Sequence, residues 1–210
     1  MMHWYQWIAL GTFGLCLGIC SFHLIRLIRL GKPDDKASPS GSIPKGVAYS
    51  FTAGMSPKKK ESAFLHLPTY LAGILYHLGI FGTIALFILL MFVRPVSANL
   101  IWQTIALLLS VSCVSGAAIL IKRIGSAALR RLSNPDDYIS NLLVTLFQGT
   151  AILYLLLPPA APVFFLTAAL LWLYFPLGKL KHAIYFFAAR YHLGVFFGSR
   201  GVWPATKNAA

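Results

Sequence analysis

The sequence predicts an all-α integral membrane protein, a bundle of five membrane-spanning helices that forms a single domain over residues 1–210. Two features of the composition indicate this fold class: 58% of the residues are apolar, and only 11% are charged. Such a chain is suited to lipid rather than water. The third observation is a set of five apolar segments that are long enough, or nearly so, to cross a hydrocarbon core that needs about 20 residues.

We expect the five spans at about 4–25, 69–93, 100–121, 139–157 and 163–188. The first lacks the basic leading region and the small-residue cleavage site of a signal peptide, so we expect it to be an uncleaved span. The fifth is interrupted by Pro176, Lys179 and Lys181. We expect its helix to continue past the lysines toward Ala188, because lysine side chains can extend to the membrane interface.

Two polar or mixed segments complete the chain. Residues 31–62 are rich in Pro, Gly, Ser and Lys, and they predict a loop too poor in apolar residues to fold alone. This loop is either a solvated linker or a docking site for a soluble partner. Residues 189–210 interleave aromatic residues with Arg190 and Arg200, which predicts either an amphipathic interfacial segment or a surface for a partner subunit.

The basic residues predict the topology. Seventeen of the 18 Lys and Arg residues lie in 26–60, 122–131 and 179–207, and Arg94 is the exception. Because basic residues stay on the cytoplasmic side, we expect an outside N-terminus and a cytoplasmic C-terminus in a bacterial or archaeal cytoplasmic membrane. Orientation and anionic lipid headgroups explain the net charge of +13, so membrane lipid is an expected partner and nucleic acid is not.

Two histidines carry the candidate chemistry. His77 and His182 lie in the predicted second and fifth spans, which run antiparallel, and both fall in the inner half of the membrane. Two neutral imidazoles at similar depth on different helices are what a bis-histidine haem requires. Gly73 and Gly79 would leave room for a flat ring near the backbone. The alternative is that each histidine forms a hydrogen bond between helices.

The segments YHLGIF and FPLGKLKH, together with five spans, an outside N-terminus and a length near 210, resemble the cytochrome b (gamma) subunit of respiratory nitrate reductase. Related membrane subunits belong to heterodisulfide-reductase-like and sulfite-reduction-associated complexes. The resemblance implies b haems between spans two and five, which carry electrons from a quinol to an iron-sulfur subunit on the cytoplasmic face. His77 and His182 match the positions that ligate the haem iron nearer that partner.

The sequence departs from this family at the second haem. The two positions that would ligate it hold Phe87 and Phe164. Because the whole ligand pair is absent while the other pair is intact, we expect one haem b. The same departure weakens the case for an outer quinone site of the family's kind.

His66 and His192 form another candidate pair. They lie eleven residues before His77 and ten after His182, so on antiparallel helices both are displaced by about 15 Å in the same direction. They could ligate a second haem, or they could hydrogen bond a quinone headgroup or a loop carbonyl at the interface. Pro68 favours the interface, because it places His66 at the mouth of the span rather than inside a helix.

The sequence therefore predicts a membrane cytochrome b subunit of a respiratory oxidoreductase complex, which passes electrons between the (mena)quinone pool and a cytoplasmic iron-sulfur subunit. We expect it not to be catalytic alone. The alternative is a cofactor-free membrane anchor of an enzyme complex. A small transporter is disfavoured, because the five acidic residues all lie outside the predicted spans and leave no carboxylate relay.

Overall fold

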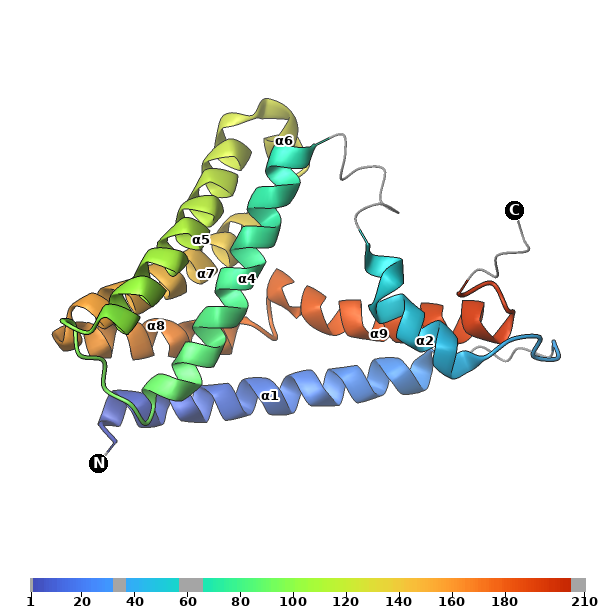
Figure 1. Ribbon diagram of the computed structural model, residues 1–210, viewed down its shortest axis with the longest axis horizontal. Helices are drawn as coiled ribbons and strands as arrows, with labels where there is room; N and C mark the ends of the chain where they lie inside the picture. The colour runs from blue at the N-terminus through green and yellow to red at the C-terminus, as the bar shows by residue number, and fades with distance from the viewer. Residues whose placement is uncertain (1, 32–36, 57–65, 205–210) are drawn as a thin grey trace. The chain divides into compact units, whose positions relative to one another are not determined.

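The computed structural model describes residues 2–31, 37–56 and 66–204 (Figure 1). All regular structure within these ranges is helical, which confirms the predicted all-α class. The α-helices are α1 (Trp4–Leu30), α2 (Ile43–Phe51), α4 (Leu67–Leu90), α5 (Leu100–Gly125), α6 (Ala127–Arg131), α7 (Pro135–Leu156), α8 (Ala161–Tyr174) and α9 (His182–Ser199). Short 3-10 turns are η1 (Ala53–Met55), η3 (Pro158–Ala160) and η4 (Lys179–Lys181).

Four helices, α1, α4, α5 and α7, are long and apolar enough to cross a membrane. They cover the first four predicted spans, which are thereby confirmed as apolar helices of spanning length. Large apolar side chains remain exposed along them, as at Leu107, Leu108 and Val114 of α5, which are 66–68% exposed. Exposed apolar faces of this kind fit a lipid environment.

The fifth predicted span is not one continuous helix. Helix α8 ends at Tyr174, and α9 begins only at His182. Pro176 accounts for the break, because proline has no backbone N–H and its ring clashes with the carbonyl four residues earlier. The backbone instead turns, and the Leu177 and Gly178 N–H groups donate to the Tyr174 carbonyl at 3.0 and 2.9 Å. Together α8 and α9 make a fifth span only if a broken helix crosses the membrane.

Local sequence signals fix where the helices begin. Asn99 caps α5 by accepting a hydrogen bond from the Ile101 N–H at 2.8 Å. Asn134 and Asp137 form a reciprocal capping box at the start of α7. Pro68 lies in the first turn of α4, and His66 immediately precedes that helix, as the sequence predicted.

Contacts divide the chain into two compact units, 1–17 with 66–180 and 18–65 with 181–210, and the single membrane domain over 1–210 stays a prediction. In the first unit, α4, α5 and α7 pack side by side and α8 packs on α7 (Figure 1). Polar groups join the first three helices: Ser112 Oγ of α5 donates to the Tyr76 carbonyl of α4 at 3.1 Å. The fully buried Gln148 of α7 lies 3.0 Å from the same hydroxyl.

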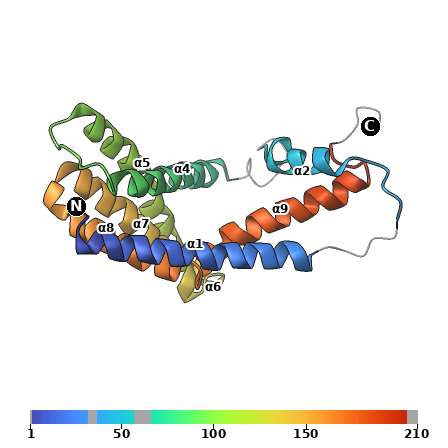
Figure 2. The same cartoon turned by 90° about the horizontal axis from the view of Figure 1, so that it is seen from below.

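In the second unit, α2 lies along α9 (Figure 2). The buried Gly46 of α2 meets the buried Gly194 and Gly198 of α9, so the two backbones approach closely. Ser50 Oγ donates to the Arg190 carbonyl at 2.7 Å. Part of the predicted loop 31–62 is therefore helical and held on α9. Residues 32–36 and 57–62 of that loop, and 205–210 of the C-terminal segment, lie outside the described residues.

Candidate functional site

His77 is exposed on α4 and has a defined tautomer. Its Nδ1 lies 2.7 Å from the Gly73 carbonyl, one turn earlier in the helix. A carbonyl oxygen only accepts, so Nδ1 carries the proton of the neutral ring and Nε2 keeps a free lone pair. Histidines that ligate a metal commonly donate their second ring nitrogen to a carbonyl in this way.

The two glycines near His77 have different surroundings. An added Cβ at Gly73 would have no atom within 4 Å, so the backbone there faces open space. An added Cβ at Gly79 would overlap the Ser112 side chain of α5. Gly79 therefore serves close packing of α4 against α5, and the prediction that it leaves room for a flat ring is wrong. For Gly73 the same role stays a prediction.

The surface around His77 is apolar and uncovered within its unit. Leu71, Ile74, Leu78 and Phe81 of α4 are between 39% and 65% exposed. Ile74 and Phe81, three residues before and four after His77, lie on the same side of the helix as His77. An exposed imidazole surrounded by apolar side chains is suited to binding a hydrophobic planar cofactor with a metal at its centre.

His182 is the first residue of α9, and its side chain is exposed. Tyr185 and Phe196, on the same side of α9, are 51% and 39% exposed. His77 belongs to the first unit and His182 to the second. The predicted axial pair is thus divided between the units and stays a prediction.

His66 and His192 are divided in the same way. His192 Nε2 lies 3.2 Å from the Leu27 carbonyl in the last turn of α1, so this nitrogen donates a hydrogen bond. The ring also packs against Gly31, where an added Cβ would overlap it. This contact favours the carbonyl-binding alternative over haem ligation for His192. The exposed His66 makes no side-chain capping bond at the start of α4.

Phe87 and Phe164, which replace the second histidine pair of the resembling family, lie in a closed aromatic cluster. Their ring centroids are 6.3 Å apart, and both are at most 1% exposed. Phe147 stacks on Phe164 at 5.6 Å, and Trp172 meets Phe87 at 5.5 Å. These buried rings fill the space between α4, α7 and α8, so the cluster is packed core.

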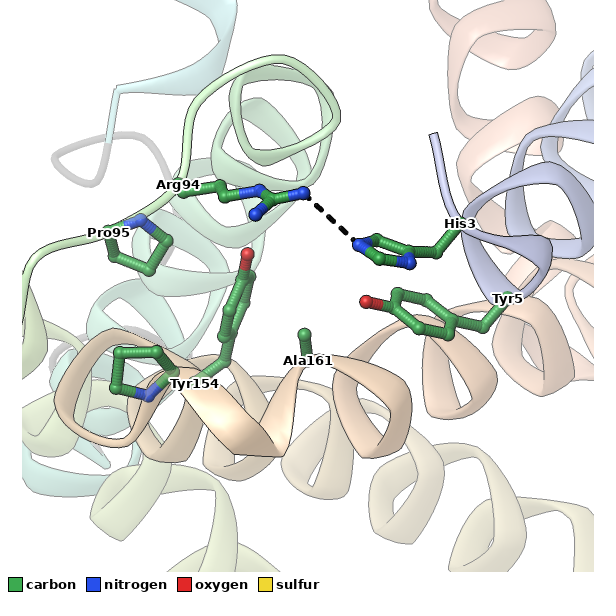
Figure 3. Close-up of a pocket in the computed structure, with 7 residues that line it drawn as sticks. His3, Tyr5, Arg94, Pro95, Tyr154 and Ala161 are labelled. Atoms are coloured by element: carbon green, nitrogen blue, oxygen red, sulfur yellow. Dashed lines mark hydrogen bonds between the residues drawn. The ribbon is translucent and has the colours of Figure 1, made fainter. Parts of the chain in front are cut away.

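A cavity of about 200 Å³, which no sequence motif predicted, lies at the end of the first unit where α4 leads into α5 (Figure 3). His3, Tyr5, Arg94 and Tyr154 contribute its polar lining. They come from three distant parts of the sequence, so no local motif announces them. Arg94, the one basic residue outside the three basic regions, was the available signal.

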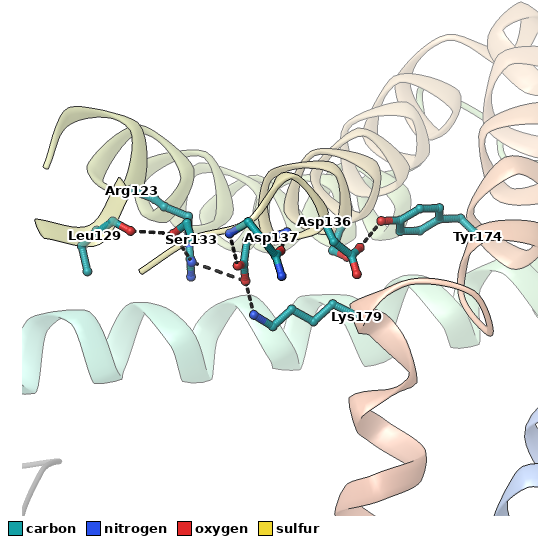
Figure 4. A network of polar contacts seen from close by, with 9 residues as sticks. Arg123, Leu129, Ser133, Asp136, Asp137, Tyr174 and Lys179 are labelled. Carbon is teal, nitrogen blue, oxygen red and sulfur yellow. Dashed lines mark hydrogen bonds and ion pairs between the residues drawn. The ribbon is translucent and has the colours of Figure 1, made fainter. Parts of the chain in front are cut away.

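The two acidic residues that the structure describes, Asp136 and Asp137, form a second group, at positions that the sequence placed outside the predicted spans (Figure 4). Asp137, 8% exposed, pairs with Arg123 at 3.4 Å and with Lys179. Asp136 accepts hydrogen bonds from Tyr174 and, at 3.0 Å, from Ser140. The run Asn-Pro-Asp-Asp, with Asn as a cap and Asp three residues later, was a readable signal for this cluster.

No protein family, curated protein or solved structure matches this chain. The fold itself defines the class: an all-helical chain with four candidate membrane spans, or five if α8 and α9 form a broken one.

Proposed function

We propose that this protein is a membrane cytochrome b, in which His77 and His182 ligate one haem b. It passes electrons between the quinone pool and a cytoplasmic iron-sulfur subunit of a respiratory complex. The observation that carries the proposal is the His77 hydrogen bond to Gly73, which leaves Nε2 as a free ligand on an open apolar face. Bound haem would supply the one-electron chemistry.

The residues of the chain would then bind the haem and shield it from water. His77 would offer its Nε2 nitrogen to the haem iron, and the Gly73 carbonyl holds the orientation of the ring. The apolar side chains around it exclude water, and a low dielectric tunes the reduction potential. Gly73 allows a flat ring to approach the backbone, because nothing lies within 4 Å of its missing Cβ.

A single haem is supported by the aromatic cluster. Phe87 and Phe164 offer no ligand atom, and their buried rings pack directly against Phe147 and Trp172. His192 differs from His77 in the nitrogen that is occupied: His192 Nε2 is hydrogen bonded to the Leu27 carbonyl, whereas His77 Nε2 is not used by the bond to Gly73.

A reduced-minus-oxidised spectrum with pyridine haemochrome quantitation tests the proposal on the detergent-purified protein. We expect one b haem per chain, lost in His77→Ala and in His182→Ala. His23→Ala is the matched control, because His23 is also exposed on an apolar helix and should leave the haem in place. Two haems per chain, reduced to one by His66→Ala or His192→Ala, would contradict the single-haem assignment.

A ligand exchange separates loss of ligation from misfolding. His77→Met keeps a ligand at the position, and a Met/His pair raises the reduction potential relative to bis-histidine ligation. We expect the variant to retain haem with a higher midpoint potential. A folded protein that takes up no haem, even with ample haem supply, would instead support the cofactor-free membrane anchor.

A further inference from the structure

The polar groups that line the cavity of Figure 3 contact one another and neighbouring rings. Tyr5 is stacked between His3, with centroids 5.2 Å apart, and Phe165, at 5.7 Å. Arg94 Nη2 donates to His3 Nε2 at 3.1 Å, since an arginine only donates. Tyr154, on α7, is only 4% exposed, and its hydroxyl points toward the cavity.

These groups leave hydrogen-bond donors unused. A guanidinium has five N–H donors, and among the described residues Arg94 bonds only His3. Within the same residues, no hydrogen bond is formed by the Tyr5 or Tyr154 hydroxyl. The cavity therefore gathers one full positive charge and two hydroxyl donors around space for a small group.

Among the residues that the structure describes, no carboxylate lies beside Arg94 to balance that charge. The acidic residues that the structure describes are Asp136 and Asp137, and both belong to the cluster at the start of α7. Arg94 lies at the opposite end of the unit, beside the C-terminal end of α7. A cavity whose described lining holds a cation and two phenols but no acidic side chain is complementary to an oxyanion.

We propose that this cavity binds a phosphate group, with Arg94 as the charged contact and Tyr5 and Tyr154 as hydroxyl donors. Arginine matches phosphate because its planar fork donates two parallel hydrogen bonds. The phosphate could belong to a phospholipid headgroup or to free inorganic phosphate, and the chemistry of recognition is the same. The residues of this site are not the proposed haem ligands, so its test does not depend on the proposed cytochrome function.

The test uses the full-length protein in detergent after removal of native lipid. Native mass spectrometry measures binding of phosphatidylglycerol, and isothermal titration calorimetry measures binding of inorganic phosphate. We expect Arg94→Gln to weaken binding about tenfold or more and Tyr154→Phe about threefold. Lys122→Gln is the matched control: it removes an exposed cation at the other end of the unit and should change affinity less than about twofold.

The two arms identify the source of the phosphate. Arg94-dependent binding of phosphatidylglycerol alone would assign a lipid headgroup, and Arg94-dependent binding of inorganic phosphate would show that the free anion suffices. If Arg94→Gln loses helicity by circular dichroism, Arg94→Lys replaces it, with about threefold weaker binding expected because the fork is lost. Equal binding by wild type, the Arg94 variant and the Lys122 control, or no binding in either arm, would overturn the proposal.

Discussion

At the scale of single residues, the neighbours of a glycine decide its role. Gly79 and Gly116 both lie where α4 meets α5: an added Cβ would overlap Ser112 at Gly79 and the Tyr76 ring at Gly116. Gly73 lies only six residues before Gly79 on the same helix but faces open space. The sequence shows that all three are glycines in apolar helices. It does not show which of them touches a neighbouring helix, because that depends on how the helices are rotated.

We therefore predict that Gly79→Ala destabilises the protein by about 1–3 kcal/mol, because the methyl group must displace Ser112 from a packed interface. In thermal unfolding this corresponds to a Tm lower by about 2–10 °C. Gly73→Ala is the control and should leave the Tm of the haem-free protein unchanged or slightly raised.

The double variant Gly79→Ala/Ser112→Gly refines this prediction. Ser112→Gly removes the obstructing side chain, and so the two changes together should cost less than the sum of the single changes. Purely additive effects would show that Gly79 does not act through Ser112.

The chemistry of single residues was only partly predictable. The sequence identified His77 as a candidate ligand, and the spacing of a histidine and a carbonyl one turn apart made its bond to Gly73 accessible to reasoning. The bond from His192 to Leu27 joins residues 165 positions apart. The cavity around Arg94 likewise depends on three segments that only the folded chain brings together.

At the scale of elements, the acidic cluster holds the segment after α8 against the start of α7. Tyr174, the last residue of α8, donates to Asp136, and Lys179, in the turn before α9, pairs with Asp137. The break at Pro176 thus has fixed contacts on both sides. From the sequence, Lys179 was expected to extend to the membrane interface, whereas in the structure it pairs with a carboxylate.

We predict that Asp137→Asn lowers stability by about 1–2 kcal/mol, since the side chain keeps its size and an acceptor oxygen but loses its charge. The figure is modest because the partner side chains are partly exposed, 52% for Lys179 and 32% for Arg123. Thermal unfolding should show a Tm about 2–8 °C lower at low ionic strength.

Salt and a neighbouring variant provide the controls for this prediction. The difference between wild type and Asp137→Asn should shrink in about 1 M salt, where charges are screened within about 3 Å. Asp136→Asn should have the smaller effect, because the structure gives Asp136 hydrogen bonds but no ion pair among the described residues. A Tm for Asp137→Asn equal to that of wild type at low salt would rule out a stabilising role for the ion pairs.

Helix α2 is the second element whose placement the sequence did not show. Its glycine contact with α9 is between backbones: a Cβ at Gly194 would lie 2.6 Å from Val47 Cα and 3.0 Å from its nitrogen. A single backbone atom of a helix cannot move without moving the helix. We therefore predict that the added methyl group of Gly194→Ala separates α2 from α9. Tryptic cleavage after Lys45, which lies in α2, should become about tenfold faster.

Gly11→Ala in α1 is the matched control for this cleavage assay, because nothing lies within 4 Å of the missing Cβ there. It should leave the cleavage rate at the wild-type value. Unchanged cleavage in Gly194→Ala would mean that the close contact does not hold α2 in place.

At the scale of the whole molecule, the sequence predicted the helical class and four spans because both depend on apolar length alone. The helices α1, α4, α5 and α7 follow directly from uninterrupted apolar runs. The fifth span was wrongly predicted to be one continuous helix, because Pro176 breaks the helix despite the apolar residues on either side of it. The pairing of helices within each unit was not predictable, since it rests on small residues and hydrogen bonds such as those of Gly46 and Ser112.

The distribution of charge still predicts how the molecule lies in its membrane. The loop between α4 and α5 has Arg94 as its single basic residue. The segment at the other end of α5 has four basic residues, namely Lys122, Arg123, Arg130 and Arg131. Basic residues remain on the cytoplasmic side. The cavity around Arg94 should therefore face outward and the acidic cluster inward, so that the proposed phosphate site lies on the outer side of the membrane.

Single cysteines tested with a membrane-impermeant maleimide on intact cells measure this topology. Ala98→Cys and Ala128→Cys form a matched pair, because both positions are exposed and lie on either side of α5. We expect labelling of Ala98→Cys in intact cells and of Ala128→Cys only after lysis. Wild type is the background, since Cys16, Cys20 and Cys113 lie within the apolar helices α1 and α5. The reverse pattern would place the Arg94 cavity in the cytoplasm and the basic segments outside, where a cytoplasmic redox partner could not reach them.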